Sequence, residues 1–316
     1  MRLSRLKIRG LGDVPETCWM TIDPHLTIFR IGDRTTSHRL LRAIQAINPD
    51  YAYGVQQPFR DYPTEIITND GYRKRIDPEK RTVGLAVFNA SSSLVTELGS
   101  ITSTLYATDR IEVGRKLDYS CWINFVELAS SCRWSDVSAD IGKLMETDPP
   151  LSRSHSLANL VGRMKETDRI RGEAMDILSD WLNDLRGGHA DQELIGSLIS
   201  KIRRASYFAD ARRVVAARMP LFVSMHRVDL FRSAADVSPV NSADTGRYPP
   251  VVLLNLLDVP ETDTSRLLEV LGGVASQNQY LCFVSEHCPL RPGTDLTVVG
   301  ENDILAAGAP TARRTH

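Results

Sequence analysis

Two apolar runs in the C-terminal part of the sequence are each followed directly by polar residues that could do chemistry. Residues 251–257 are followed by Asp258, and residues 280–285 are followed by Glu286 and His287. Both runs have the length of a strand, and a helical pattern over residues 265–271 separates them, which predicts a parallel sheet. Parallel strands end at one edge of a sheet, so Asp258 and His287 are expected at the edge where such sheets present catalytic groups.

The N-terminal part predicts a strand, a polar loop and a helix in succession. Residues 5–9 and 26–31 have strand patterns, and residues 40–44 open a helix. The loop between them contains one glycine, Gly32, followed by an acid and several basic or hydroxyl residues. Arginine binds phosphate oxygens well, whereas Asp33 would repel a polyphosphate.

Together these segments resemble the ABC-type ATPase heads of the RecF, OLD and SMC group. Residues 258–261, Asp-Val-Pro-Glu, stand at the family's Walker B motif, and residues 286–289, Glu-His-Cys-Pro, at its switch histidine. The resemblance implies an α/β fold of the P-loop NTPase type (ABC-type head), a mixed sheet with an inserted helical subdomain. It also implies that Asp258 is the metal-binding and catalytic carboxylate and that His287 is its catalytic neighbour.

The loop departs from the glycine-rich phosphate motif of that family. Aligned without a gap, Ser37 occupies the lysine position and His38 the hydroxyl position; with a one-residue deletion, His38 and Arg39 occupy them. Neither alignment restores the lysine that reaches the phosphate oxygens or the glycines that turn backbone N–H groups toward them. The candidate nucleotide-binding residues are Gly32, Arg34, Ser37, His38 and Arg39. We therefore expect ATP and magnesium to bind weakly or not at all.

Two further departures agree with this expectation. Val259 replaces the glutamate that orients the attacking water in the family, and an aliphatic side chain cannot do so. Residues 233–249 lack the Ser-x-Gly and the helix of the family's signature segment. Phosphoryl transfer depends on such positioning groups, so the sequence predicts a degenerate head with lost or weak hydrolysis.

Three parts are expected along the chain: an ATPase-like lobe at 1–116, a helical insertion at 117–235 and a second lobe at 236–316. In the first part, residues 65–68 and 72–75 predict a hairpin around the turn residues 69–71, and residues 83–88 predict a strand. In the second part, apolar stripes over residues 152–186 and 194–202 predict helices that pack into a core of their own.

Composition is that of a globular protein and excludes several classes. The 316 residues are 42% hydrophobic and 24% charged, with a formal net charge of −1, so bulk charge gives no argument for nucleic-acid binding. Five cysteines contain no C-x-x-C pair and indicate reduced thiols rather than a zinc site. No apolar run reaches the ~18 residues of a membrane span. We expect a cytoplasmic protein with no membrane partner.

One local cluster of basic residues predicts a DNA-binding strip. The cluster consists of Lys201, Arg203, Arg204, Arg212 and Arg213. On a helix, Arg204 and Arg212 share a face with Lys201, and such a strip would bind phosphates in a salt-dependent way. The other interpretation is a solvated face or a partner for an acidic subunit.

The leading hypothesis is a degenerate ABC-type head that serves as a regulatory or scaffolding subunit. Its setting, implied by the resemblance alone, is a bacterial DNA-associated complex for repair or phage defence, with an intact ATPase or another subunit as its protein partner. Two alternatives are an active ATPase whose unusual loop is completed by a partner subunit, and a DNA-binding module that uses the basic strip.

Overall fold

The computed structural model describes residues 1–11, 14–50, 59, 62, 65–67, 72–102, 105–128, 132–147, 155–186, 191–225, 246–273, 278–289, 297–300 and 304. The chain divides into two compact units. One unit contains residues 1–91, 109–124 and 216–316, and the other contains residues 92–108 and 125–215. The three-part division expected from the sequence stays a prediction.

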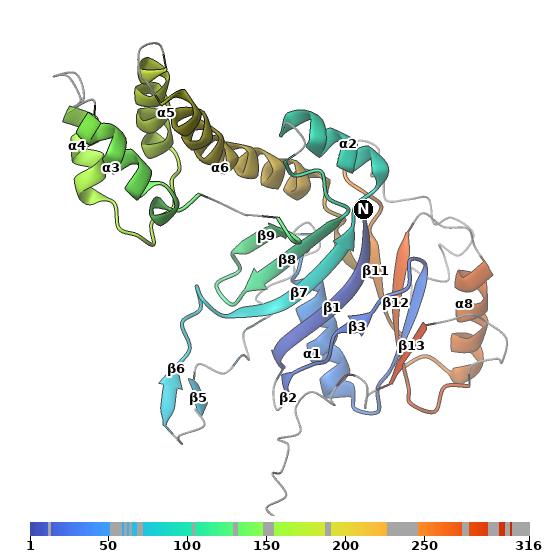
Figure 1. Ribbon diagram of the computed structural model, residues 1–316. Helices are drawn as coiled ribbons and strands as arrows, with labels where there is room; N and C mark the ends of the chain where they lie inside the picture. The colour runs from blue at the N-terminus through green and yellow to red at the C-terminus, as the bar shows by residue number, and fades with distance from the viewer. Residues whose placement is uncertain are drawn as a thin grey trace, which may run out of the picture. The chain divides into compact units, whose positions relative to one another are not determined.

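A five-stranded parallel sheet forms the centre of the first unit (Figure 1). Its strands, in spatial order, are β10 (Phe222–Met225), β11 (Val251–Asn255), β12 (Gln279–Val284), β4 (Leu26–Arg30) and β13 (Thr297–Gly300). Every neighbouring pair is parallel. The strands predicted before the loop, before Asp258 and before Glu286 are therefore confirmed, and they lie side by side.

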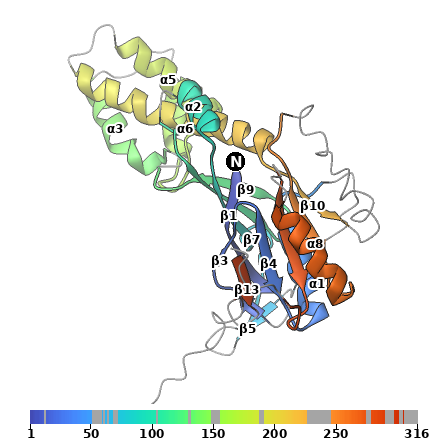
Figure 2. The same ribbon diagram turned by 90° about the vertical axis from the view of Figure 1, so that its right-hand side faces the viewer.

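Helices pack on this sheet because both of its faces are apolar. Helix α8 (Glu261–Gly273) lies along the strands in Figures 1 and 2, and its Leu267 and Leu268 join the buried cluster of the strands. Helix α1 (Arg34–Gln45) contacts strands of the parallel sheet and of a second, antiparallel sheet. Phe29 and Phe283 stack with ring centroids 4.9 Å apart, which joins neighbouring strands by side-chain packing as well as by hydrogen bonds.

The antiparallel sheet belongs to the same unit. Its strands are β1 (Arg2–Leu11), β2 (Val14–Glu16), β3 (Met20–Thr21), β7 (Thr82–Asn89), β8 (Arg110–Lys116) and β9 (Cys121–Phe125). The buried amide of Gln279 joins the two sheets: its Oε1 accepts from the Leu3 backbone N–H at 3.0 Å, and its Nε2 donates to the Leu3 carbonyl at 2.7 Å and the Asp23 carbonyl at 2.6 Å. The expected α/β fold with parallel and antiparallel strands is confirmed, with the two strand types in separate sheets.

A third, two-stranded sheet matches the predicted hairpin. It pairs β5 (Glu65–Ile67) with β6 (Arg73–Arg75) in antiparallel register. The predicted turn at residues 69–71 lies outside the described residues.

The second unit is mainly helical. It contains α2 (Ser92–Ile101), η2 (Trp134–Asp136), α3 (Ser138–Thr147), α4 (His155–Arg163), α5 (Glu173–Leu185) and most of α6 (Gln192–Arg218). Its core includes the predicted apolar stripes: Leu157, Leu160, Leu178, Trp181, Leu182, Ile195, Leu198, Ile199 and Ile202. The expectation that these stripes form a core of their own is confirmed.

Some local details differ from or add to the expectations. Two helices, α4 and α5, carry the apolar stripe predicted over residues 152–186, because a turn in which Asp168 Oδ2 accepts from the Lys165 N–H at 2.8 Å separates them, and Gly172 (φ 53°) precedes α5. Strands β9 and β10 lie in residues 117–235, the stretch that was expected to be helical. Their conformation is extended because each pairs with a neighbouring strand. Helix α2 was not foreseen.

In the described ranges, no helix is long and apolar enough to span a membrane.

Candidate functional site at the edge of the parallel sheet

The segments that follow β4, β11 and β12 meet at the carboxyl edge of the parallel sheet. The Ile31 N–H donates to the Val284 carbonyl at 3.1 Å, and the Leu256 N–H donates to the Phe283 carbonyl at 2.8 Å. Hydrogen bonds between these neighbouring segments therefore continue past the ends of β4 and β11. The chain places β10, β11 and β12 on one side of β4 and β13 on the other. In α/β proteins, ligands bind at the carboxyl edge of the sheet next to such a reversal of strand order.

Helix α1 begins inside the segment that was expected to be a loop. Its first residue is Arg34 and its N-cap is Asp33, whose Oδ2 accepts from both the N–H and the Oγ1 of Thr36 at 2.7 Å. Aspartate is a strong N-cap, and no glycine after Gly32 favours a turned backbone here. The prediction that the helix opens at Leu40 is therefore wrong. Residues 34–39 form helical turns rather than a phosphate-wrapping loop.

The Asp33 carboxylate gives the helix start its own negative charge. Its hydrogen bond with the Thr36 hydroxyl is the largest cause that lowers the pKa of Asp33, and the Thr36 backbone N–H adds to the effect. A helix N-terminus binds anions through its unpaired N–H groups and the helix dipole. In this chain the Asp33 carboxylate satisfies part of that site, and this carboxylate stays ionised at neutral pH.

Arg34 and Asp258 form an ion pair across the edge of the sheet. Arg34 Nη2 contacts Asp258 Oδ1, and the two side chains are 69% and 60% exposed. The structure thus brings together one predicted phosphate-binding residue and the predicted metal-binding residue. An exposed pair of this kind contributes only about 0–1 kcal/mol of stability. Its importance is chemical, because a guanidinium stands beside the carboxylate that the resemblance assigns to magnesium.

The other predicted nucleotide-binding residues differ in their access to solvent. Gly32, His38 and Arg39 are exposed, whereas Ser37 is fully buried and its Oγ has no hydrogen-bond partner among the described residues. A buried Ser37 leaves the lysine position of the ungapped alignment without a side chain at the surface.

The predicted catalytic histidine follows β12 in an exposed turn. The His287 N–H donates to Ser285 Oγ at 3.4 Å, and its side chain is exposed. Arg30 holds this turn close to β4, because its Nη2 donates to the Cys288 carbonyl at 2.8 Å. His287 is therefore at the same sheet edge as Asp258, as expected, but no hydrogen bond joins them among the contacts of the described residues.

Taken together, these residues do not fit magnesium and a triphosphate. Val259, which is 9% exposed, stands where the resemblance expects a water-orienting glutamate, an acid caps the helix, and a cation pairs with Asp258. Within the described part of the chain, no group of three or more His, Cys, Asp or Glu side chains is arranged to hold a metal ion.

The predicted DNA-binding strip is partly used by contacts within the chain. Lys201 Nζ lies 3.3 Å from Asp140 Oδ2, Arg213 pairs with Asp210 at 3.3 Å, and the Arg212 guanidinium lies 5.7 Å from the centre of the Phe208 ring. At 100° per residue, Arg213 points about 120° away from Lys201, so the five cations surround α6 rather than line one face.

Sequence reasoning missed the capping role of Asp33. The signal was present, because an aspartate three residues before a threonine, ahead of an apolar helical pattern, is a typical helix start. The ion pair of Arg34 with Asp258 had no local signal, since it joins residues at opposite ends of the sequence.

Comparisons with known proteins give structural neighbours only. No family model and no curated protein matches the sequence. One similar solved structure is an Smc head domain from Pyrococcus furiosus with an extended coiled coil, bound to the C-terminal domain of ScpA; it is 10% identical, with a TM-score of 0.34 over 92% of this chain and 90% of that one. Another is an Smc head bound to the C-terminal winged-helix domain of ScpA, 8% identical, with a TM-score of 0.37 over 95% and 94% of the two chains. The α/β fold class rests on the strand arrangement itself.

Proposed function

We propose that this chain has the architecture of a P-loop ATPase head but does not hydrolyse ATP, and that it acts as a regulatory or scaffolding subunit. One observation supports the proposal above all others. The residues at the phosphate and metal positions already have partners within the chain: Asp33 caps α1, and Arg34 pairs with Asp258.

The physical reason is charge. A triphosphate would meet the Asp33 carboxylate at the helix start, where a phosphate needs free N–H donors. Magnesium would have to displace Arg34 from Asp258, and the protein offers no lysine at the loop to bind the phosphates instead. Phosphoryl transfer is almost entirely positioning and charge neutralisation, so the loss of these groups removes most of the catalysis.

The setting of this subunit remains part of the proposal. The resemblance of the sequence to RecF, OLD and SMC heads supports a cytoplasmic, DNA-associated assembly for repair or phage defence, with an intact ATPase or another subunit as partner. A partner with a complete site would supply the hydrolysis that this chain lacks.

Isothermal titration calorimetry with Mg-ATP tests the nucleotide part of the proposal. We expect no heat of binding at micromolar concentrations and no phosphate release. Micromolar affinity that disappears in Asp258→Ala, but not in the control Asp180→Ala on the exposed side of α5, would overturn it. That result would favour the active ATPase in which Arg34, His38 or Arg39 replaces the lysine.

A second variant tests whether the negative charge of Asp33 is what prevents a triphosphate from binding. Asp33→Asn keeps an N-cap side chain but removes the charge, so the affinity for inorganic triphosphate should rise if the carboxylate excludes anions. An unchanged affinity in Asp33→Asn would show that electrostatic exclusion by Asp33 is not the reason.

A further inference from the structure

The β5–β6 ribbon, residues 65–67 paired with residues 73–75, is separate from the two larger sheets of its unit. In Figure 1 the ribbon projects from the N-terminal end of β7. A two-stranded ribbon alone is marginally stable in water, because it buries little apolar surface. Contacts at its base must therefore hold it in place.

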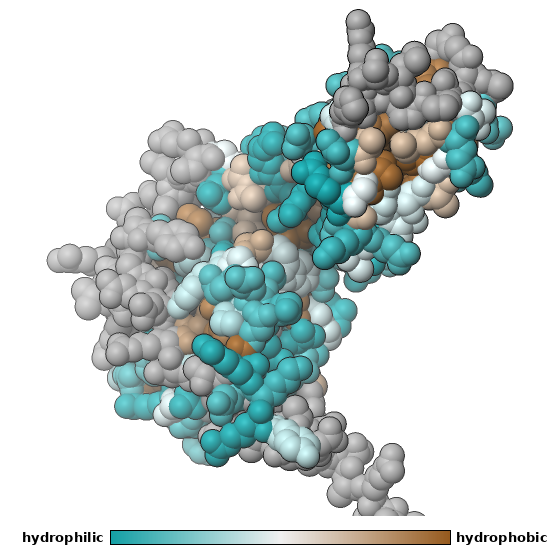
Figure 3. Space-filling model, turned by 90° about the vertical axis from the view of Figure 1, so that its left-hand side faces the viewer, coloured by the Kyte–Doolittle hydropathy of each residue, from teal (hydrophilic) through white to brown (hydrophobic). Residues whose placement is uncertain are grey.

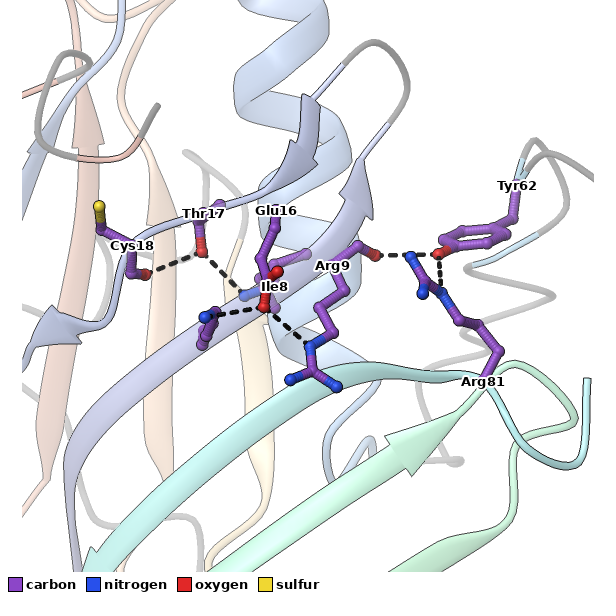
Figure 4. A network of polar contacts seen from close by, with 8 residues as sticks. Ile8, Arg9, Glu16, Thr17, Cys18, Tyr62 and Arg81 are labelled. Atoms are coloured by element: carbon purple, nitrogen blue, oxygen red, sulfur yellow. Dashed lines mark hydrogen bonds and ion pairs between the residues drawn. The ribbon is translucent and has the colours of Figure 1, made fainter. Parts of the chain in front are cut away.

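The base of the ribbon is fixed to β1 by the hydrogen-bond network in Figure 4. Tyr62, just before β5, donates its hydroxyl hydrogen to the Arg9 carbonyl at 3.2 Å, and Arg81, after β6, donates from Nε to the Tyr62 hydroxyl at 3.0 Å. Ile76 directly after β6 is only 8% exposed. Both ends of the ribbon are thus attached while its strands project.

The projecting strand β6 is strongly basic. Arg73, Lys74 and Arg75 are all exposed, and Tyr72 beside them is 75% exposed. Glu65 on β5 is the acid nearest to them among the described contacts, with its Oε2 3.9 Å from Arg73 Nη1. Successive strand residues point to opposite faces, so Arg73 and Arg75 lie on one face of the ribbon and Lys74 on the other.

Cations on both faces of a narrow ribbon match a groove that has phosphates on both sides. The major groove of B-form DNA is about 12 Å wide and admits a two-stranded β-ribbon. An acidic protein surface would meet one face only, and the major groove of A-form RNA is too narrow for side chains to enter. Figure 3 views the side of the molecule on which β5 and β6 lie in Figure 1, and the lower part of this face is mainly hydrophilic.

We infer that the β5–β6 ribbon binds duplex DNA by entering the major groove, with Arg73, Lys74 and Arg75 in contact with backbone phosphates. The contacts are to phosphates, so the binding is independent of base sequence. This site is distinct from the basic residues of α6, and it does not depend on the state of the nucleotide site.

Fluorescence anisotropy with a short labelled duplex, titrated over about 50–200 mM salt, tests the inference. The slope of log K against log salt is negative, and each lost phosphate contact makes it less steep by about 0.9, so the slope of the triple variant R73Q/K74Q/R75Q should be less negative by about 2.7. Its affinity at about 100 mM salt should fall at least about tenfold. These side chains are exposed, so the variant should keep the unfolding midpoint of the wild type.

The matched control is R203Q/R204Q/R213Q, which removes the same charge from α6 and should leave the slope unchanged. The inference is overturned if the wild-type protein binds no duplex, or if the ribbon variant keeps the wild-type slope. It is also overturned if polyglutamate displaces the labelled duplex as effectively as unlabelled DNA does, since the ribbon would then be a site for an acidic protein.

Discussion

Gly114 on β8 faces the indole ring of Trp122. This contact predicts that a larger residue at position 114 destabilises the fold. A methyl group at position 114 would lie closer than 3.0 Å to Cε2, Cζ2 and Nε1 of Trp122, a separation that real Cβ atoms do not adopt. The indole also donates from Nε1 to Thr82 Oγ1 at 3.1 Å. Gly114→Ala must therefore displace the ring and break this hydrogen bond.

The expected cost follows from these two losses. Overpacking of a filled position costs about 1–3 kcal/mol, and a partly exposed hydrogen bond contributes about 0.5–1 kcal/mol. We expect Gly114→Ala to lower the free energy of unfolding by about 1.5–4 kcal/mol. The control is Gly142→Ala inside α3, where an added methyl meets nothing within 4 Å, and which should stabilise the protein by about 0.5–1 kcal/mol.

Urea unfolding followed by circular dichroism measures both variants, and a double-mutant cycle tests the cause. In a Trp122→Ala background the clash is absent, so the cost of Gly114→Ala should fall below about 0.5 kcal/mol. An equal cost in both backgrounds would refute the reasoning, because the destabilisation would then come from the backbone of β8 rather than from the indole.

Burial strongly raises the pKa of Cys282, so a thiol reagent at neutral pH should modify the partly exposed Cys18 and Cys121 before Cys282 in the native protein; equal rates for the three thiols would contradict this. Gln279→Ala leaves the buried N–H and carbonyl of Leu3 without their side-chain partner and should cost about 2–4 kcal/mol, seen as a lower urea midpoint. The lowered pKa of Asp33 means that its carboxylate stabilises the fold above about pH 4 and that this contribution is lost as pH falls through the lowered pKa. Asp33→Asn should reduce the loss of stability between neutral and acid pH, and an unchanged pH profile would refute the assignment.

The elements that the sequence predicted well are those with strong hydrophobic patterns. Strands β11 and β12 are continuous apolar runs buried on both faces, and the helical core of the second unit follows stripes at helical spacing. Helix α2 was missed because only two of its residues, Leu94 and Leu98, are buried, which is too weak a stripe to recognise. Strand β9 was missed because its pairing with β8 decides its conformation.

For the candidate site, the sequence nominated residues by type and position but gave no information on their contacts. Asp258 and Arg34 were chosen for their residue types and positions, yet their pairing depends on the strand order that places β4 near β11. Asp33 was interpreted only as a charge that repels phosphate, and its hydrogen bonds to Thr36 add a structural role. Ser37 was assigned to the ligand, but burial of a side chain depends on the packing of the whole unit.

The N-terminal cap of α1 also limits how readily a nucleotide site could arise at this helix. A single substitution that placed a lysine at position 37 would insert a charge into a buried position while the helix already ran through residues 34–36. A working phosphate loop would need glycines, the lysine and the removal of Asp33 at the same time. Intermediates along that route would lose the cap before they gained a ligand, so the capped helix start is easy to keep.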